Sequence, residues 1–329
     1  MPPSFPCQKN PKAHAEGMER GNHTEVTEFL LLGLSQTREV QLFLFVLFLL
    51  FYIVIFPANI LIILSIWGDP HLGSPMYFFL ANLAFLDICY CFVIPPKVIS
   101  HFLSHHKTIS YGGCLAQLFF LHLLGGAEIN LLMGMAFDRY VAICQPLRYT
   151  TVVSRGVCWA LVGAAWAVGF MHSFIQVIPI ARLPFCGPNE LDSFFCDITQ
   201  VIKLACTDVY VLEFFMFFNS GLVTMLCFIL LLISYGALLV RLWAGGSSKG
   251  MSKAASTCIT HIIIIIIMFG PATYIYCRPF RSFPLDKVVA VFHTVVFPLL
   301  NPIIYTLRNK EIISAMKRLL GRYGLWRGK

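Results

Sequence analysis

Seven long apolar windows restrict what this chain can fold into more than any other feature of its sequence. A helix that crosses the hydrocarbon core of a bilayer needs about 20 predominantly apolar residues. Only the second window contains a charged residue, Asp87, and the third continues its apolar pattern past Ala127 to Ile143. The windows are Val40–Trp67, Pro75–Pro96, Tyr111–Ala127, Gly156–Ala181, Phe214–Val240, Ala254–Cys277 and Val288–Leu307. They predict an all-α membrane protein, a bundle of seven transmembrane helices.

The composition of the whole chain supports this reading. Of its 329 residues, 58% are hydrophobic and 12% are charged, whereas soluble chains average about 45–50% and about 25%. A water-soluble domain has no interior large enough for this much apolar surface. The same high apolar and low charged content excludes a disordered chain, and it excludes a small disulfide-stapled domain.

Basic residues near the window ends predict the orientation, because loops rich in Lys and Arg stay in the cytoplasm. They gather in alternate loops and in the tail: Arg148, Arg155, Arg241, Lys249, Lys253, Arg308, Lys310, Lys317, Arg318, Arg322, Arg327 and Lys329. We expect an extracellular segment 1–39, a bundle 40–308 and a cytoplasmic tail 309–329, in a multi-pass protein of the plasma membrane. The net charge of +8 then marks contact with membrane lipids rather than with nucleic acid.

The two ends of the chain carry weaker signals. Segment 1–39 has no apolar stretch, so we expect no cleavable signal peptide, and Met18 is an alternative start to Met1. Asn22 opens an Asn-His-Thr glycosylation sequon in this outer segment. In the tail, apolar side chains fall on one face of a short helix, which favours a basic amphipathic helix on the inner leaflet over a frayed tail; they are Ile312, Ile313, Met316, Leu319 and Leu320.

Cysteines on the outer side are candidates for disulfides, because that compartment is oxidising. Cys114 opens the third window, and Cys186, Cys196 and Cys206 lie in the loop after the fourth. Four cysteines allow three pairings, and their spacing alone does not choose among them.

Ionisable groups inside a membrane span are costly and mark functional positions. Asp87 and Glu128 lie in the middle of the second and third spans, and Asn59 and Asn301 lie at comparable depths in the first and seventh. Two carboxylates at one site need a cation such as sodium, or one of them must hold a proton. The alternative is a neutral hydrogen-bonded network without an ion. No other cofactor is expected.

Several spans present side chains that face a common interior in their outer halves. We expect these to form a ligand cavity: His122, Gly125, Gly126 and Ile129, then Asn219, Ser220 and Val223, then Phe269, Ala272 and Tyr276, with Thr294. The glycines leave room for a ligand or allow close helix packing. No acid lies between Tyr111 and Ala127, so an amine would lack a partner there, and we expect a small neutral ligand to which His122 donates one hydrogen bond.

Asp138-Arg139-Tyr140 ends the third span on the cytoplasmic side. An arginine at this rim is either a topology anchor or a residue that its neighbouring acid holds until a cytoplasmic partner takes it.

These motifs together resemble the odorant receptors of the rhodopsin-like G-protein-coupled family, from about Met18 to Gly321. The matching runs are Pro75-Met76-Tyr77-Phe78-Phe79-Leu80, Leu83-Ala84-Phe85-Leu86-Asp87, Met135-Ala136-Phe137-Asp138-Arg139-Tyr140-Val141-Ala142-Ile143-Cys144, Ser234-Tyr235, Lys253-Ala254-Ala255-Ser256-Thr257-Cys258 and Pro298-Leu299-Leu300-Asn301-Pro302-Ile303-Ile304-Tyr305. The chain departs from the family pattern at Ala58, Phe137 and Phe269, and the last change removes a hydroxyl near the expected cavity.

The resemblance implies particular partners and site roles. It implies disulfides Cys114–Cys196 and Cys186–Cys206, and a sodium ion shared by Asp87 and Glu128 in the resting state. It implies that odorant binding activates a heterotrimeric G protein of the stimulatory olfactory type, which raises cyclic AMP in sensory cilia. The residues that it assigns to activation and coupling are Asp138, Arg139, Tyr140, Tyr235, Asn301, Pro302 and Tyr305.

Two other classes of membrane protein are less consistent with the sequence. A transporter of a small solute is the main alternative, but it favours an internal repeat, and seven spans do not divide into equal halves. An intramembrane enzyme is disfavoured because the chain shows no His-Glu-x-x-His run, phosphate-binding glycine loop or pair of aspartates placed for proteolysis.

Overall fold

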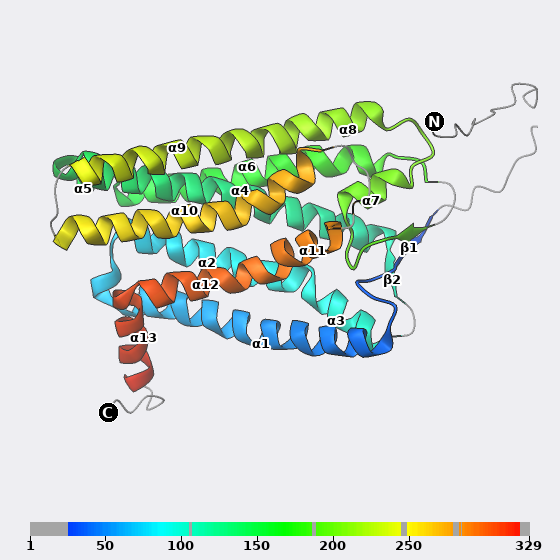
Figure 1. The fold of residues 1–329 in the computed structure, drawn as a ribbon, viewed down its shortest axis with the longest axis horizontal. Coiled ribbons are helices and arrows are strands. Elements are labelled where there is room, and N and C mark those ends of the chain that lie inside the picture. Colours follow the sequence, from blue (N-terminus) through cyan, green and yellow to red (C-terminus); the bar gives the residue numbers. More distant parts are fainter. Residues whose placement is uncertain are drawn as a thin grey trace, which may run out of the picture.

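The computed structural model describes residues 26–104, 107–185, 189–244, 249–278, 283 and 285–322. Long helices lie roughly side by side along one direction and form a bundle (Figure 1). The bundle consists of α1 (Arg38–Gly68), α2 (Pro75–Val93), α3 (Pro95–Leu103), α4 (Tyr111–Cys144), α6 (Arg155–Ala181), α8 (Tyr210–Met216), α9 (Val223–Ala244), α10 (Lys249–Tyr276), α11 (Asp286–Val291) and α12 (Phe297–Arg308). The remaining helices are α5 (Tyr149–Val152), α7 (Ile198–Lys203) and α13 (Lys310–Arg322).

Local chemistry explains where several helices begin. The Ser110 hydroxyl accepts from the backbone N–H of Gly113 and caps α4, and Ser154 caps α6 in the same way. Pro75 occupies the first turn of α2, where its missing N–H has no cost. We expected the second span to end at Pro96. Instead, the chain bends at Ile94 and continues as α3, because prolines that interrupt a helix also suit the start of the next one.

The seven predicted windows are helical in the structure, with somewhat different ends. Six helices among the described residues are long and apolar enough to cross a membrane. The seventh window corresponds to α11, a π-helical turn at Phe292–Val296 and α12, which follow one another without a break. Large apolar side chains on the outside of the bundle, such as Phe43, Trp159 and Ile233, are more than half exposed, as expected for a surface that contacts lipid.

The sequence did not predict a small sheet that covers one end of the bundle. Strand β1 (Glu28–Leu31) pairs antiparallel with β2 (Thr108–Ser110) and parallel with β3 (Glu190–Leu191), so it is the central strand. Its Phe29 and Leu31 are buried in a hydrophobic cluster under the sheet. We call the three strands together with residues 192–203 the lid.

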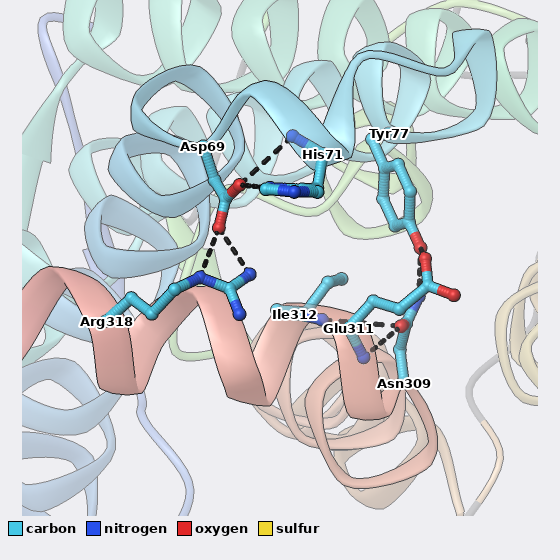
Figure 2. Close-up of polar contacts among 7 residues, drawn as sticks. All are labelled: Asp69, His71, Tyr77, Asn309, Glu311, Ile312 and Arg318. Atoms are coloured by element: carbon cyan, nitrogen blue, oxygen red, sulfur yellow. Dashed lines mark hydrogen bonds and ion pairs between the residues drawn. The ribbon is translucent and has the colours of Figure 1, made fainter.

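Helix α13 lies across the opposite end of the bundle from the strands (Figure 1). Two contacts hold it there (Figure 2): the Arg318 guanidinium pairs with Asp69 after α1, and the Tyr77 hydroxyl donates to Glu311 at 2.5 Å. Asp69 also accepts from the backbone N–H of His71. Because Arg318 donates to it, the pKa of the Asp69 carboxyl lies well below its usual range.

The start of α13 is fixed by Asn309, whose side-chain oxygen accepts from the backbone N–H groups of Glu311 and Ile312 (Figure 2). Ile312 and Ala315 are buried against the bundle. The predicted tail helix is therefore present, and its inner face packs on α1 and α12.

Candidate functional site

The lid closes a cavity of about 100 Å³ between α4, α6, α9, α10 and the seventh helix. Among the predicted ligand-binding residues, seven line it: His122, Gly125, Gly126, Ser220, Ala272, Tyr276 and Thr294. Ile129 lines it as well. An apolar cavity of about 150 Å³ in another protein holds benzene, so this smaller cavity suits only a small organic molecule.

Three predicted cavity residues lie elsewhere. Val223 is 50% exposed on the outside of α9, and Asn219 contacts His172 at 3.5 Å. The cause is a π-helical turn at Phe217–Leu222. Its extra residue rotates the following helix, so that Ser220 and Thr224 face the cavity in place of Asn219 and Val223.

The third of these residues, Phe269, is fully buried below the cavity. Its ring stacks on Phe228 with the ring centres 5.6 Å apart. The neighbouring Met268 lines the cavity instead.

Residues that sequence reasoning missed come mainly from the lid and from helix faces that were not considered; they are Tyr90, Leu118, Leu121, His172, Phe195, Asp197, Ile198, Thr224, Met268, Ile275, Ala290 and His293. His172 offered a signal, because it is a polar side chain inside an uncharged window. Asp197 offered none, because its place depends on how the loop folds back over the bundle.

The lid is tied to the bundle by covalent and polar contacts. The implied disulfide Cys114–Cys196 is present. Beside it, the buried Gln117 side chain accepts from the backbone N–H of Cys196 at 2.8 Å and donates to the Val93 carbonyl at 2.9 Å. Lys287 at the start of the seventh helix pairs with Asp192 of the lid at 2.6 Å.

The second implied disulfide is only partly described. Cys206 is disulfide-bonded, but Cys186 lies outside the described residues, as does the Asn22 sequon.

Asp197 places a carboxyl group at the cavity. Its side chain accepts from the backbone N–H and the hydroxyl of Thr199, both at 2.8 Å. Burial raises the pKa of Asp197, although these hydrogen bonds partly oppose the rise. The outer part of α4 has no acidic residue, but the cavity wall as a whole does, because Asp197 belongs to it.

The two glycines of α4 have different roles. A Cβ on Gly126 would lie 2.9 Å from the Cα of Gly169, so Gly126 allows α4 and α6 to pack closely. A Cβ on Gly125 would instead meet the Tyr90 hydroxyl at 3.3 Å, across the bundle interior. Of the two explanations left open by the sequence, close packing applies to Gly126 and room inside the bundle to Gly125.

The predicted carboxylate site lies at the inner end of the cavity, where Glu128 belongs to the wall. The Asn301 amide donates to Asp87 at 3.1 Å and to Glu128 at 3.4 Å. Among the four residues of this site, three buried oxygens have no hydrogen-bond partner: Asn59 Oδ1, Asp87 Oδ2 and Asn301 Oδ1. Oxygen atoms are the ligands that hard cations prefer, so these residues fit a sodium ion.

Near the α13 end, Arg139 and Asp138 form an ion pair, and Asp138 also accepts from the Tyr149 hydroxyl at 2.7 Å. Asp138 is fully buried. Tyr140, in contrast, is 44% exposed on the outside of α4, so the structure does not bring it together with the other two residues of its motif.

A second contact near this end joins two helices. The Tyr235 hydroxyl of α9 lies 2.7 Å from Nδ1 of His261 on α10, and both side chains are buried. Pro302 and Tyr305 lie in α12, but their side chains are outside the described part of the structure.

Comparison with known proteins gives matches over nearly the whole chain. A family model described as "Olfactory receptor" matches residues 48–322. Olfactory receptor 4M1 of Mus musculus is 61% identical over 307 residues, which cover 93% of this chain and 98% of that protein. The human olfactory receptor 4M1 is 59% identical with the same coverage, and human olfactory receptor 4N4 is 58% identical over 93% of this chain and 96% of its own length.

Proposed function

Because the chain belongs to the olfactory receptor family of G-protein-coupled receptors, we propose that it binds small, mostly neutral odorants in the cavity under the lid. Binding activates a heterotrimeric G protein of the stimulatory olfactory type and raises cyclic AMP. The observation that carries the proposal is the cavity itself, whose wall combines residues of α4 and α10 with the lid. An occupant therefore contacts both the helix that carries Arg139 and the helix that carries His261.

The ligand is held mainly by apolar burial, which contributes about 25 cal/mol per Å² of apolar surface. Leu118, Ile129 and Met268 supply such surface, and the cavity volume restricts the ligand to a small molecule. We expect affinities in the range of about micromolar to millimolar.

An amine is the second candidate ligand, and Asp197 is the one observation that favours it. However, Thr199 already donates two hydrogen bonds to this carboxyl group, and the raised pKa of Asp197 reflects an environment that favours the neutral form. If amines are the ligands, Asp197→Asn should abolish their effect while leaving neutral odorants active.

Activation is a shift of population, since a ligand favours a conformation only by binding it more tightly than the alternative. In the described conformation, Arg139 is held by Asp138, and α9 and α10 are joined by Tyr235 and His261. We propose that the active state moves the inner end of α10 outward and releases Arg139 to contact the G protein.

The carboxylate site belongs to the resting state in this proposal. Asp87, Glu128, Asn59 and Asn301 would hold a sodium ion, whose charge would offset that of the two carboxylates. The unpartnered buried oxygens support this assignment. The alternative is a proton on one carboxyl group, which would make that group a hydrogen-bond donor to a neighbouring oxygen and would need no ion.

The basic residues of the tail support an orientation with α13 in the cytoplasm, against the lipids of the inner leaflet. The lid and segment 1–39 are then extracellular, and we propose the plasma membrane of sensory cilia as the location. No catalytic role is proposed.

A cyclic-AMP reporter in cells that express the receptor tests the function against an odorant panel. Arg139→Ala should abolish the odorant response while the receptor still reaches the surface. Arg148→Ala is the matched control, because Arg148 is an exposed arginine at the same end of the bundle and its loss should leave the response intact. A normal response in Arg139→Ala would refute the coupling role of Arg139.

A further inference from the structure

Two polar groups meet across the ligand cavity. Nε2 of His122 on α4 lies 3.3 Å from the hydroxyl of Tyr276 on α10. Both residues line the cavity, so a ligand there reaches this contact.

The other nitrogen of His122 fixes which way the hydrogen bond runs. Nδ1 lies 2.8 Å from the backbone carbonyl of Leu118, and a carbonyl oxygen only accepts. The ring proton of a neutral imidazole is therefore on Nδ1, and Nε2 is an acceptor. The expectation that His122 donates to a ligand is thus reversed: it accepts, and at present it accepts from Tyr276.

This hydrogen bond is easily replaced, because 3.3 Å is long for a hydroxyl donor. We propose that the preferred ligands of the receptor are small alcohols or phenols, whose hydroxyl group inserts at this contact. The ligand O–H donates to Nε2 of His122, and the ligand oxygen accepts from the Tyr276 hydroxyl. The proposal rests on the odorant-binding function proposed above and names the chemical class of its ligands.

Of an alcohol, a carbonyl compound and a hydrocarbon, only the alcohol satisfies both protein atoms at once. A carbonyl oxygen accepts from Tyr276 but leaves Nε2 of His122 without a donor, which is unfavourable for a buried acceptor. A hydrocarbon leaves the original hydrogen bond in place and gains only apolar contact. A site that must hydrogen-bond a substrate hydroxyl discriminates strongly against analogues that lack it.

Several other polar groups on the wall are already bonded. The Thr294 hydroxyl donates to the Ala290 carbonyl at 2.7 Å, and the Ser220 hydroxyl accepts from Gln176. His293 differs, because its buried Nδ1 has no hydrogen-bond partner. It is the competing position for a ligand hydroxyl, and a His293 variant is therefore the control for His122.

The test measures binding by the rise in thermal unfolding temperature of the purified receptor, since a ligand that binds only the folded state raises it. The probes are two matched sets: cyclohexanol, cyclohexanone and cyclohexane, and benzyl alcohol, benzaldehyde and toluene. We expect each alcohol to bind about tenfold more tightly than its carbonyl counterpart. Equal binding of alcohol and carbonyl, or no binding by either alcohol, would overturn the proposal.

Variants locate the preference within the cavity. His122→Phe keeps a ring but removes the acceptor, so the alcohol-to-carbonyl ratio should fall to about one, because both probes then only accept from Tyr276. Tyr276→Phe should keep the preference, since Nε2 remains an acceptor, and so should His293→Phe. If the preference survives in His122→Phe and disappears in His293→Phe, the hydroxyl binds at the other histidine and the proposal is wrong.

The same probes in the cyclic-AMP reporter separate this proposal from the proposed function. Alcohols that bind selectively without raising cyclic AMP would contradict the signalling function and leave the ligand class standing. Carbonyl compounds that bind and signal as well as the alcohols would contradict the proposed ligand class and leave the signalling function standing.

Discussion

At the scale of single residues, Gly169 is a position where an added methyl group has a clear consequence. A Cβ there would lie 2.5 Å from the Leu123 carbonyl oxygen and 2.8 Å from the Ala127 nitrogen, both rigid backbone atoms of α4. Gly169→Ala should therefore force α4 and α6 apart, with a loss of about 1–3 kcal/mol. Thermal unfolding of the purified receptor measures this.

The control is Gly163→Ala on the same helix, where nothing lies within 4 Å of the added Cβ. It should be neutral or slightly stabilising, because alanine favours helix more than glycine does. An equal loss of stability in both variants would show that the α4–α6 contact is not the cause.

Asp197 should make stability depend on pH in a predictable direction. Its pKa is raised in the folded protein, so folding favours the protonated form. The stabilisation that the Asp197 carboxyl group contributes is then fully present below the ordinary pKa of about 3.9. It is lost as pH rises through the raised pKa of the folded protein. Asp197→Asn keeps an oxygen that accepts from Thr199 and should remove this loss.

The test is to measure the melting temperatures of the wild type and of Asp197→Asn across the pH range. The melting temperature of the variant should rise relative to that of the wild type as pH increases. The charged groups that also act on Asp197 are Lys203 and Asp286, and both stay in place. The exposed Asp208→Asn is the control in the same loop. Parallel curves for Asp197→Asn and wild type would contradict the prediction.

The sequence predicted site residues well where the energetic cost of a charged group inside a membrane span singled them out. Asp87 and Glu128 stand out because a charge in a membrane span is expensive, and the structure joins both to Asn301. The sequence was a poorer guide where the position of a backbone atom decides what a side chain can do. The direction of the His122 hydrogen bond depends on which carbonyl lies beside Nδ1, and no residue pattern carries that information.

At the scale of elements, the fifth helix shows how helical periodicity fails. Spacing of four residues grouped Asn219 with Val223, but the π-helical turn adds one residue and moves that face outward. Apolar residues lie on every side of a lipid-facing helix, so hydrophobic patterning gives no warning of such a turn. The end of the second span was also missed, because the chain bends at Ile94 and continues as α3 instead of stopping at Pro96.

Helix α13 depends on its two contacts with the α1–α2 end of the bundle (Figure 2). In a double variant, Tyr77→Phe with Arg318→Gln, backbone amide exchange in residues 310–322 should accelerate by less than about tenfold. The reason is that a partly exposed ion pair and the hydrogen bonds of the Tyr77 hydroxyl each contribute modestly. Arg322→Gln, an exposed arginine on the same helix, should leave exchange unchanged. Hydrogen exchange followed by mass spectrometry measures both.

The acceleration should be the same at pH 5 and pH 8. The pKa of Asp69 lies far below its ordinary value, so the pair with Arg318 is fully formed above about pH 3.9 and is lost only in stronger acid. Wild-type exchange in α13 that rises at pH 5, after correction for the intrinsic pH dependence of exchange, would show that Asp69 does not hold the helix.

At the scale of the whole molecule, the bundle was predictable and its cover was not. The apolar windows mark the helices because each must satisfy its backbone hydrogen bonds within the hydrocarbon core. The lid joins three short segments far apart in the chain, residues 28–31, 108–110 and 190–191. Their pairing depends on where the helices place the loop ends, and short strands carry little pattern of their own.

The number of membrane crossings decides the topology of the receptor, and it can be measured directly. Within the described residues, six helices meet the length and apolarity of a span, and the seventh, which contains the π-helical turn at Phe292–Val296, is not among them. If all seven cross, the two ends of the chain lie on opposite sides of the membrane, whereas six crossings place them on the same side. We expect seven, because the α11–α12 segment packs inside the bundle against α1, α2 and α10.

Antibodies against epitope tags at the two termini, applied to intact and to permeabilised cells, distinguish these cases. The N-terminal tag should stain intact cells and the C-terminal tag only permeabilised ones. Asn22→Gln should also reduce the apparent mass of the receptor on a gel if the N-terminus enters the secretory lumen, because the sequon would be glycosylated there. Staining of both tags on intact cells would mean that the seventh helix does not cross the membrane and would leave the basic tail outside the cell.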